Sequence, residues 1–323
     1  MQKDQNARYY NKETMLANVA LLYYGEGLTQ SDIARRMSVS RATVVNMLRE
    51  ARETRIVNIL VEGKYLAGSS MSNELRDKFG LEDVYVANSG KSDSKVSRAE
   101  MLRHLGRVGA IALTDITEPG DTIGVAWGET IFSLSEQMPQ VRKPDVTVCQ
   151  MIGSMNSEIV PASEQCAIQI ANMMSAKCFT LHAPGVGSSP EIAALLRTEP
   201  TIEQQLLRLR SLDVTVASIG HVGDQTHLVK ANMTTLEELH AARDAGAVGV
   251  ICCRYIDANG EPVRVPPDDR LIATDCEDLR LARKKLLVVG GVRRKDAVLA
   301  AIKGDYVTHL CIDQSLAAAL LDS

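Results

Sequence analysis

The sequence of 323 residues predicts an α/β protein made of a small all-helical domain and a larger domain with a mostly parallel sheet. Its length is about twice that of a usual domain, which favours two domains. Residues 1–62 have mainly helical periodicity, whereas strand-like apolar runs alternate with helical stretches from Met71 onward. The small and polar sequence GKYLAGSS predicts the boundary between about Glu62 and Ser70, so the second domain spans residues 70–323.

Composition and charge exclude several classes of protein. Apolar residues make up 45% of the chain, enough for a substantial core, but no apolar run approaches the roughly 18 residues of a membrane helix. The start, MQKDQNARYYNKETM, lacks the apolar centre of a signal peptide, so we expect a cytoplasmic protein with no membrane partner. The net charge of −4 argues against a general polyanion binder. The first 60 residues nevertheless contain nine Lys and Arg against six Asp and Glu, which places the basic excess at the N-terminus.

The cysteines predict neither a disulfide framework nor a zinc site. There are seven of them, an odd number, and none has CxxC spacing. We therefore expect no metal and no cofactor. The adjacent Cys252 and Cys253 are expected to point to opposite faces of a strand, one of them inward as a small hydrophobic residue. The alternative is a reactive pair.

Three helices are expected in the first domain. A first, supporting helix carries an apolar stripe formed by Met15, Leu16, Val19, Leu22 and Tyr23. Thr29, followed three residues later by Asp32, predicts a capping box for a second helix from about Gln30 to Met37. Ser40 is the expected N-cap of a third helix. The buried face of that helix comprises Val44, Met47 and Leu48.

The bend Met37-Ser38-Val39 between the second and third helices predicts a helix-turn-helix. Ile33 and Met37 face inward, Val39 fills the bend, and Ala34 has only a methyl group, too small to hold a crossing helix away. A helix-turn-helix places the start of its last helix in the DNA major groove. The alternative is an ordinary helical hairpin with a solvated charged face.

Side chains on the outer face of this motif are the candidate DNA contacts. Arg41 is suited to guanine, Asn46 to adenine, and Ala42 or the Thr43 methyl group to a thymine methyl group. The residues better suited to phosphates are Arg35, Arg36, Arg49, Arg52 and Arg55. The predicted partner is operator DNA. The predicted set of contacts is Arg35, Arg36, Ser40, Arg41, Ala42, Thr43, Asn46 and Arg49.

In the second domain, helices between the strands predict a mostly parallel sheet covered on both sides. The strand candidates are DVYVAN, TIGVAW, VTVCQMIG, KCFTLHA, DVTVASIG, VGVICCRYI, KLLVVGG and VTHLCID. Two helices are expected to begin with Ser/Thr-x-x-Glu boxes, Ser97 with Glu100 and Thr234 with Glu237. Before the boundary, RIVNILVEG reads as a short strand over residues 56–61, a wing or the start of a linker.

Ligands of such sheets bind where strand ends lead into helices. In GVAWGETI a strand ends at about Trp127 and a helix starts at about Glu129, so the backbone amides of Gly128, Glu129 and Thr130 favour an anion. The alternative is a tight turn made for packing. A comparable strand end in QMIGSMN places Gly153 there.

Three further residues that follow strand ends point to the same kind of ligand. In QMIGSMN, Ser154 follows the glycine. In GGVRRKD, Arg293 and Arg294 lie at a helix start, where cations oppose the helix dipole. Solvent exposure would account for these arginines, but an anionic ligand above the sheet accounts for them better.

The order and spacing of the motifs resemble the SorC family of bacterial sugar-responsive transcriptional regulators over nearly the whole chain. After the helix-turn-helix, the motifs are ELRDKFGLEDVYV, DTIGVAWGETI, MIGS, HAPGV, SIG, AGAVGVICCRYIDANG and VVGGVRRKDAVLAAIKGDYVTHLCIDQSLAAALL. The resemblance implies a second domain with the fold of glucosamine-6-phosphate deaminase and ribose-5-phosphate isomerase. It also implies a phosphorylated sugar or related metabolite as effector, and a homodimer or homotetramer on operator DNA.

The resemblance further implies roles by position. The phosphate-facing loop matches Gly128, Glu129 and Thr130, the second glycine turn matches Gly153 and Ser154, and the strand-end loop before the effector matches Ser218 and Gly220. With His221, Arg293 and Arg294, these residues form the expected effector site.

This chain departs from the family's usual pattern at two positions. The family commonly has an acid after AVG, suited to sugar hydroxyls, where this chain has Val250. This departure implies an effector that is smaller, less hydroxylated or differently oriented. Arg294 stands where lysine is common, and replaces a point charge by a planar fork.

A sugar-phosphate isomerase or deaminase-like enzyme is the alternative function, since fold alone does not exclude it. Such an enzyme needs a base near the substrate carbon. The candidates are His182, His221, His227, Asp257 and Asp275. His221 is the best placed, although the role we favour for it is an imidazole that hydrogen-bonds locally or contacts the effector. The fused DNA-binding domain favours ligand binding without turnover. We therefore predict a regulator of a carbohydrate-catabolism operon, controlled by a sugar or polyol phosphate, with no catalytic residue.

Overall fold

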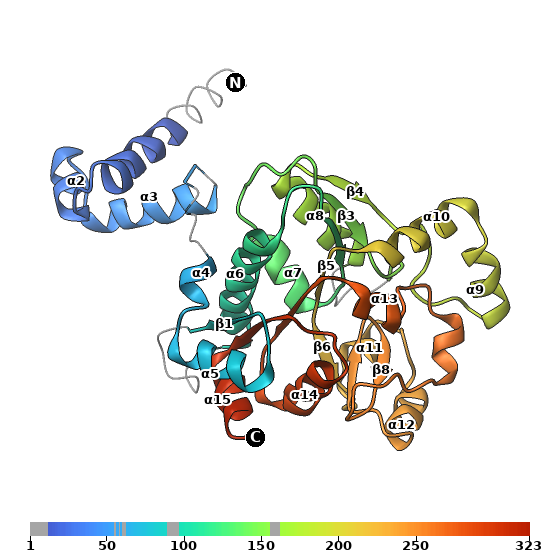
Figure 1. The fold of residues 1–323 in the computed structure, drawn as a ribbon. Helices are drawn as coiled ribbons and strands as arrows, with labels where there is room; N and C mark the ends of the chain where they lie inside the picture. The colour runs from blue at the N-terminus through green and yellow to red at the C-terminus, as the bar shows by residue number, and fades with distance from the viewer. Residues whose placement is uncertain (1–11, 55, 58, 60–62, 89–96, 156–161) are drawn as a thin grey trace. The chain divides into compact units, whose positions relative to one another are not determined.

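The computed structural model describes residues 12–54, 56, 57, 59, 63–88, 97–155 and 162–323 (Figure 1). The chain divides into two compact units, Met1–Leu60 and Val61–Ser323. Within the residues given above, no helix is long and apolar enough to cross a membrane.

The first unit contains the helix-turn-helix. Residues 12–20 are helical and continue into a π-helical turn, η1 (Leu21–Gly25), followed by α2 (Gln30–Arg36) and α3 (Arg41–Glu53). The helices share a small core formed by Val19, Ile33, Ala34, Val44 and Leu48. These residues are those that the helical periodicity places inward, so the apolar pattern alone accounts for the packing.

Both helices of the motif begin at the residues that the sequence predicts. Thr29 Oγ1 accepts a hydrogen bond from the Asp32 N–H at 3.2 Å, and Ser40 Oγ accepts one from the Thr43 N–H at 3.0 Å. Each bond satisfies one of the N–H groups that a helix start leaves without a partner. The second helix ends at Arg36, one residue earlier than expected.

The bend between α2 and α3 depends on a left-handed residue. Ser38 has φ of 55°, and the Val39 N–H turns back to donate to the Ala34 carbonyl at 3.0 Å. After α3, the expected strand over residues 56–61 is not formed in its described part, since residues 56 and 57 lie in a bend. Residues 58, 60 and 61 lie outside the described residues.

The second unit is built on a seven-stranded sheet in which all neighbours are parallel. Its strands are β1 (Asp83–Ala87), β2 (Thr122–Val125), β3 (Thr147–Gln150), β4 (Lys177–Phe179), β5 (Val214–Ala217), β9 (Lys284–Val289) and β10 (His309–Asp313). Their order across the sheet is β1-β10-β9-β5-β2-β3-β4. The prediction of a mostly parallel α/β sheet is therefore confirmed.

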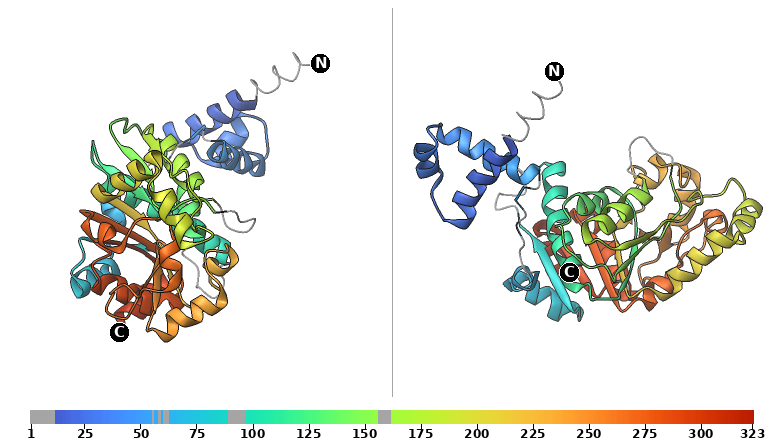
Figure 2. Two further views of the ribbon diagram at one scale, coloured as in Figure 1. Left: turned by 90° about the vertical axis from the view of Figure 1, so that its right-hand side faces the viewer. Right: turned by 90° about the horizontal axis from the view of Figure 1, so that it is seen from above.

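Helices cover both faces of this sheet (Figures 1 and 2). The helices of this unit are α4 (Gly63–Leu66), α5 (Ser70–Phe79), α6 (Arg98–Ile116), α7 (Glu129–Glu136), α8 (Ser163–Met174), α9 (Pro190–Arg197), α10 (Pro200–Arg208), α11 (His227–Lys230), α12 (Leu236–Asp244), α13 (Cys276–Leu281), α14 (Lys295–Lys303) and α15 (Gln314–Leu321), with 3-10 turns η3 (Leu209–Ser211), η4 (Pro266–Arg270) and η5 (Val292–Arg294).

The two helical layers explain why the strands have nearly continuous apolar runs. Along β9, Leu286 and Val288 join the core formed with α6, α7 and α8. Leu287 and Val289 join the core on the other face, formed with α5, α14 and α15. Successive side chains of a strand point to opposite faces, so a strand that is buried on both faces is apolar throughout.

A small antiparallel sheet, β6 (Ile219–His221), β7 (Gly249–Ile251) and β8 (Arg254–Ile256), packs beside α14. The prediction that VGVICCRYI forms one strand is therefore wrong. Cys252 and Cys253 have φ of 47° and 64°, so they form the two-residue turn of a hairpin instead of pointing to opposite faces of a strand. All seven cysteines are free thiols.

One predicted helix start is correct and the other is displaced by one residue. Ser97 Oγ accepts from the Glu100 N–H at 3.2 Å, as expected. At α12 the capping box is formed by Thr235 with Glu238, and not by Thr234 with Glu237. Thr234 is buried and its hydroxyl contacts the core, where it accepts from the Tyr255 hydroxyl at 3.4 Å, so it is not free to cap.

Candidate functional site

A cavity of about 90 Å³ lies where three adjacent central strands end. The loops that follow β9, β5 and β2 meet there, because the carboxyl ends of parallel strands lie at one edge of a sheet. The small sheet closes one side. The lining residues are Arg98, Ala126, Trp127, Gly128, Glu129, Thr130, Ser218, Ile219, Gly220, Thr226, His227, Leu228, Val250, Cys252, Cys253 and Arg294.

The start of α7 forms one wall of the cavity. Gly128, its N-cap, has φ of 110°, a conformation that L-residues with side chains rarely adopt, and it provides no side-chain cap. The first-turn N–H groups of a helix have no intrahelical partners and carry part of the positive end of the helix dipole. This wall therefore offers donors to an anion.

Glu129 is engaged by two basic side chains. Its Oε2 lies 2.6 Å from Arg98 Nη2, and its Oε1 lies 3.5 Å from His227 Nε2. Glu129 favours the charged form of Arg294 at longer range, but among the described residues it forms its ion pair with Arg98 and not with Arg294. The carboxylate fixes two side chains that reach the cavity from α6 and α11.

Arg294 is, with Arg98, one of the two arginines that line the cavity. Its Nη1 donates to the Gly290 carbonyl at 2.6 Å, and among the described residues no carboxylate forms an ion pair with it. Nearby Asp313 accepts three backbone N–H groups instead. Burial lowers the pKa of the Arg294 guanidinium, and the positive charge of Arg98 lowers it further. A partly buried cation that faces a cavity without a carboxylate partner is suited to an anionic ligand.

The pKa values of the two histidines near the cavity are lowered by burial and by nearby positive charges. Burial lowers the pKa of His221, and Arg294 and Arg293 lower it further. Burial also lowers the pKa of His227, against the opposing effect of Glu129. His221 Nδ1 accepts from the Gly223 N–H at 2.9 Å, a bond that needs the ring nitrogen unprotonated. Both rings are therefore neutral near pH 7.

This shift predicts how stability depends on pH. Between the lowered pKa values of folded His221 and His227 and the ordinary value of about 6.5, the unfolded chain binds more protons. The stabilisation is therefore complete above about pH 6.5 and is lost as the pH falls below it. Urea unfolding between pH 7 and 5 should show a falling midpoint, and the double variant His221→Gln/His227→Gln should reduce this slope. Buried His309 shifts in the same direction and keeps part of the slope. An unchanged slope would contradict the assignment.

The structure brings six of the ten predicted effector-site residues to the cavity. These are Gly128, Glu129, Thr130, Ser218, Gly220 and Arg294. His221 lies beside them in β6, and Arg293 is exposed; neither lines the cavity.

Gly153 and Ser154 also lie outside the cavity lining, and their backbone explains the glycine. The Ser154 N–H donates to the Ala183 carbonyl at 2.8 Å, and a Cβ on Gly153 would lie 2.5 Å from the Pro184 carbonyl oxygen. The close approach of two chain segments requires glycine here.

The sequence prediction missed several lining residues. Arg98 and Thr226 lie in segments without a phosphate-binding pattern, and Trp127 was named only as the strand end before Gly128. His227 was considered only as a candidate base, and Cys253 only as part of a strand or of a reactive pair. A usable signal was the Ser97 cap, which marks Arg98 as the first residue of a helix.

The remaining candidate bases have other partners. Asp257 accepts the N–H groups of a tight turn, and Asp275 pairs with Arg254 at 2.6 Å. His182 contacts the Thr180 hydroxyl at 3.2 Å, outside the cavity lining. Of the five, only His227 lines the cavity, and it contacts Glu129.

In the first unit, the outer face of α3 is open. Arg41, Ala42, Asn46 and Arg49 are exposed. Val45, which the sequence prediction missed, is 43% exposed on the same face, where its methyl groups are suited to a thymine methyl group. The exposed positions Arg41, Ala42, Val45 and Asn46 are neighbours at the start of one helix, which matches the geometry of a recognition helix.

Two of the arginines expected at phosphates, Arg35 and Arg49, are held by weak surface contacts, whereas Arg55 lies outside the described residues. Arg35 lies 3.4 Å from Asp32, and Arg49 lies 3.8 Å from Glu53. Exposed pairs of this kind contribute about 0–1 kcal/mol, so the guanidinium groups are free to exchange a carboxylate for a DNA phosphate.

Comparisons with known proteins agree with this architecture. The family model described as "Putative sugar-binding domain" matches residues 64–322. Over 99% of its length the chain is 36% identical to "Uncharacterized transcriptional regulator YjhU" of Escherichia coli strain K12, with 98% of that protein covered. It is 28% identical to the deoxyribonucleoside regulator of Bacillus subtilis strain 168, over 96% of this chain and 98% of that one. The crystal structure of the full-length sorbitol operon regulator SorC from Klebsiella pneumoniae has a TM-score of 0.75 at 26% identity, over 95% and 98% of the two chains.

Proposed function

Since the chain belongs to the SorC family of sugar-binding transcriptional regulators, we propose that residues 1–62 bind operator DNA and that residues 70–323 bind the effector and hold the oligomer together. Like its relatives, the protein is a transcriptional regulator and not an enzyme. The exposed start of α3 supports the first assignment. The cavity above the central strands supports the second.

We propose that the effector is a phosphorylated sugar or polyol. The observation that carries this proposal is Arg294, a guanidinium at the cavity without a carboxylate partner among the described residues. The donors at the start of α7, next to Gly128, supply a second positive wall. A phosphate dianion has the charge and the acceptor oxygens that both walls require. The contacts proposed for Gly153, Ser154, His221 and Arg293 remain predictions, since none of these residues lines the cavity.

The DNA-bound form is proposed to be a homodimer or homotetramer. A single helix-turn-helix offers a limited contact area, and such proteins reach operator affinity by contacting two half-sites one helical turn, or a multiple of it, apart. The second unit, which contains the two large cores, is the natural place for the contact between copies.

Point variants of α3 test the DNA assignment. Arg41→Ala and Asn46→Ala should each cost roughly 1–3 kcal/mol and relax the preference at individual operator bases, because these side chains are placed to contact base edges. Arg35→Ala should weaken binding to all sequences and flatten its salt dependence, because it is placed at phosphates. Fluorescence anisotropy on an operator and on its single-base variants measures both effects. Equal losses on all sequences for all three variants would contradict the assignment.

A further inference from the structure

The cavity has two walls of different chemistry. The wall at Arg98, Arg294 and the start of α7 is cationic and rich in donors. The rest of the lining includes an apolar surface without a charged side chain. It is formed by Trp127, Ile219, Leu228, Val250, Cys252 and Cys253. Such a cavity is complementary to a ligand with an anion at one end and an apolar part at the other.

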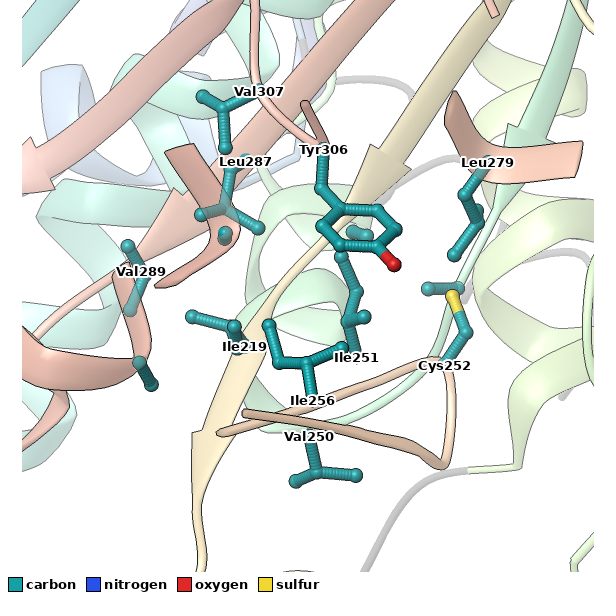
Figure 3. Close-up of a cluster of buried hydrophobic side chains, with 14 of the residues drawn as sticks. Ile219, Val250, Ile251, Cys252, Ile256, Leu279, Leu287, Val289, Tyr306 and Val307 are labelled. Carbon is teal, nitrogen blue, oxygen red and sulfur yellow. The ribbon is translucent and has the colours of Figure 1, made fainter. Parts of the chain in front are cut away.

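Val250 is held in the apolar wall by its strand. Val250 and its neighbour Ile251 on β7 both belong to the buried cluster that includes Ile256 and Tyr306. Val250 lies at the edge of that cluster, with its side chain directed away from Tyr306 (Figure 3). Val250 is 6% exposed and lines the cavity. Val250 Cγ1 lies 2.8 Å from the position that a Cβ on Gly220 would take. The neighbouring strand β6 therefore leaves the Val250 side chain little freedom to move.

The two polar groups of this wall lie beside each other. The Trp127 indole is close enough to the Cys253 sulfur to lower the pKa of that thiol, but burial outweighs this effect and raises the pKa to about 12, so the thiol is neutral. An indole and a neutral thiol side by side present mainly apolar surface to a ligand.

Few groups remain to bind ligand hydroxyls. Among the lining residues there is no Asp, Asn or Gln, and the carboxylate of Glu129 is engaged by Arg98 and His227. The other polar side chains are the hydroxyls of Thr130, Ser218 and Thr226. A sugar hydroxyl placed against Val250 would lose its water without gaining a partner, which costs free energy.

From these observations, and resting on the proposed function, we propose that the effector is a deoxy sugar phosphate: a phosphorylated compound without a hydroxyl group on the carbon that contacts Val250. The phosphate lies at Arg294 and the start of α7. The methylene or methyl carbon lies against Val250 and Trp127. The specificity of the site for deoxygenated ligands therefore depends on Val250.

Paired ligands test this proposal with the full-length protein. Isothermal titration calorimetry compares 2-deoxyribose 5-phosphate with ribose 5-phosphate, and 2-deoxyglucose 6-phosphate with glucose 6-phosphate. Each pair differs by one hydroxyl group and has the same phosphate. In at least one pair the deoxy compound should bind roughly 10- to 100-fold more tightly, the range by which an apolar pocket rejects an added hydroxyl or methylene.

Variants at Val250 link this preference to one side chain. Val250→Asp supplies an acceptor, so the preference for the deoxy compound should fall to near or below one. Val250→Thr keeps the shape of the side chain and exchanges one methyl group for a hydroxyl. It should shift the ratio of deoxy to hydroxylated affinity in the same direction, and it provides the test if the aspartate variant folds poorly. Val248→Thr makes the same exchange two residues earlier, outside the cavity lining, and should leave the ratio unchanged.

The outcomes separate this inference from the proposed function. If both members of each pair bind and lose affinity in Arg294→Leu, but the hydroxylated member binds as tightly as the deoxy one, the phosphate site is retained and the present proposal is wrong. The proposal is also wrong if Val250→Thr and Val250→Asp leave the ratio unchanged. If none of the four compounds binds, the phosphorylated effector is itself wrong and the inference falls with it.

Discussion

Replacing Arg294 by leucine should weaken binding of a sugar phosphate by about 2–5 kcal/mol, the cost of truncating one partner of a buried hydrogen-bonded charge pair. This corresponds to about 30- to 4000-fold in Kd. The effect is large because Arg294 has no carboxylate partner among the described residues, so its charge is available to the ligand. Calorimetry with the tightest of the four sugar phosphates measures the loss.

The neighbouring arginine provides the matched control. Arg293 is exposed and does not line the cavity, so Arg293→Leu should change the Kd much less than Arg294→Leu. In the ligand-free protein, Arg294→Leu should not lower the Tm, because it removes a partly buried charge without breaking an ion pair. A variant that melts normally but still binds the sugar phosphate as the original protein does would contradict the assignment of Arg294.

Removal of residues 1–62 should abolish specific operator binding. The predicted base contacts and the basic excess all lie in this segment. Specific binding typically exceeds non-specific binding by about 10³- to 10⁷-fold, so the loss should be at least about a thousandfold. An electrophoretic mobility shift assay measures it, with the thermal shift caused by the sugar phosphate as the control for folding. A truncated protein that still protects the operator from cleavage would show that the DNA contacts lie elsewhere.

The helices and most strands follow from local patterns in the sequence. In β9 and β10, apolar runs of five or six residues leave little choice but a strand buried on both faces. Ser40 and Ser97 were identified as N-caps because a short hydroxyl side chain before an amphipathic stretch has one common use. Gly128 was identified for a similar reason, since a glycine between a strand and a helix indicates a special backbone conformation.

The hairpin at Cys252 and Cys253 could not be predicted in this way. Two consecutive left-handed residues are usually Gly, Asn or Asp, and cysteine carries no such signal. The surrounding packing of β7 against α14 and β6 imposes the turn here. The same limit explains the displaced start of α12, where only the buried contact with Tyr255 distinguishes Thr234 from Thr235.

The composition of the cavity depended on contacts between distant parts of the chain. Arg98 meets Glu129 across 31 residues, and no local pattern joins them. The loop with Gly153 looked equivalent to the loop with Gly128, because both have a glycine after a buried strand. Only the tertiary structure shows that Gly153 serves the approach of the segment at Pro184.

The central claim is that a ligand in the cavity changes the affinity for DNA without being consumed. The most direct measurement is the operator affinity, by fluorescence anisotropy, without ligand and at saturation with the tightest of the four sugar phosphates. We expect a change of roughly 5- to 150-fold in the original protein, the range of a coupling free energy of roughly 1–3 kcal/mol, and no change in Arg294→Leu at the same ligand concentration. An operator affinity that stays constant while the ligand saturates the protein, or steady conversion of the bound ligand into a product, would contradict the account.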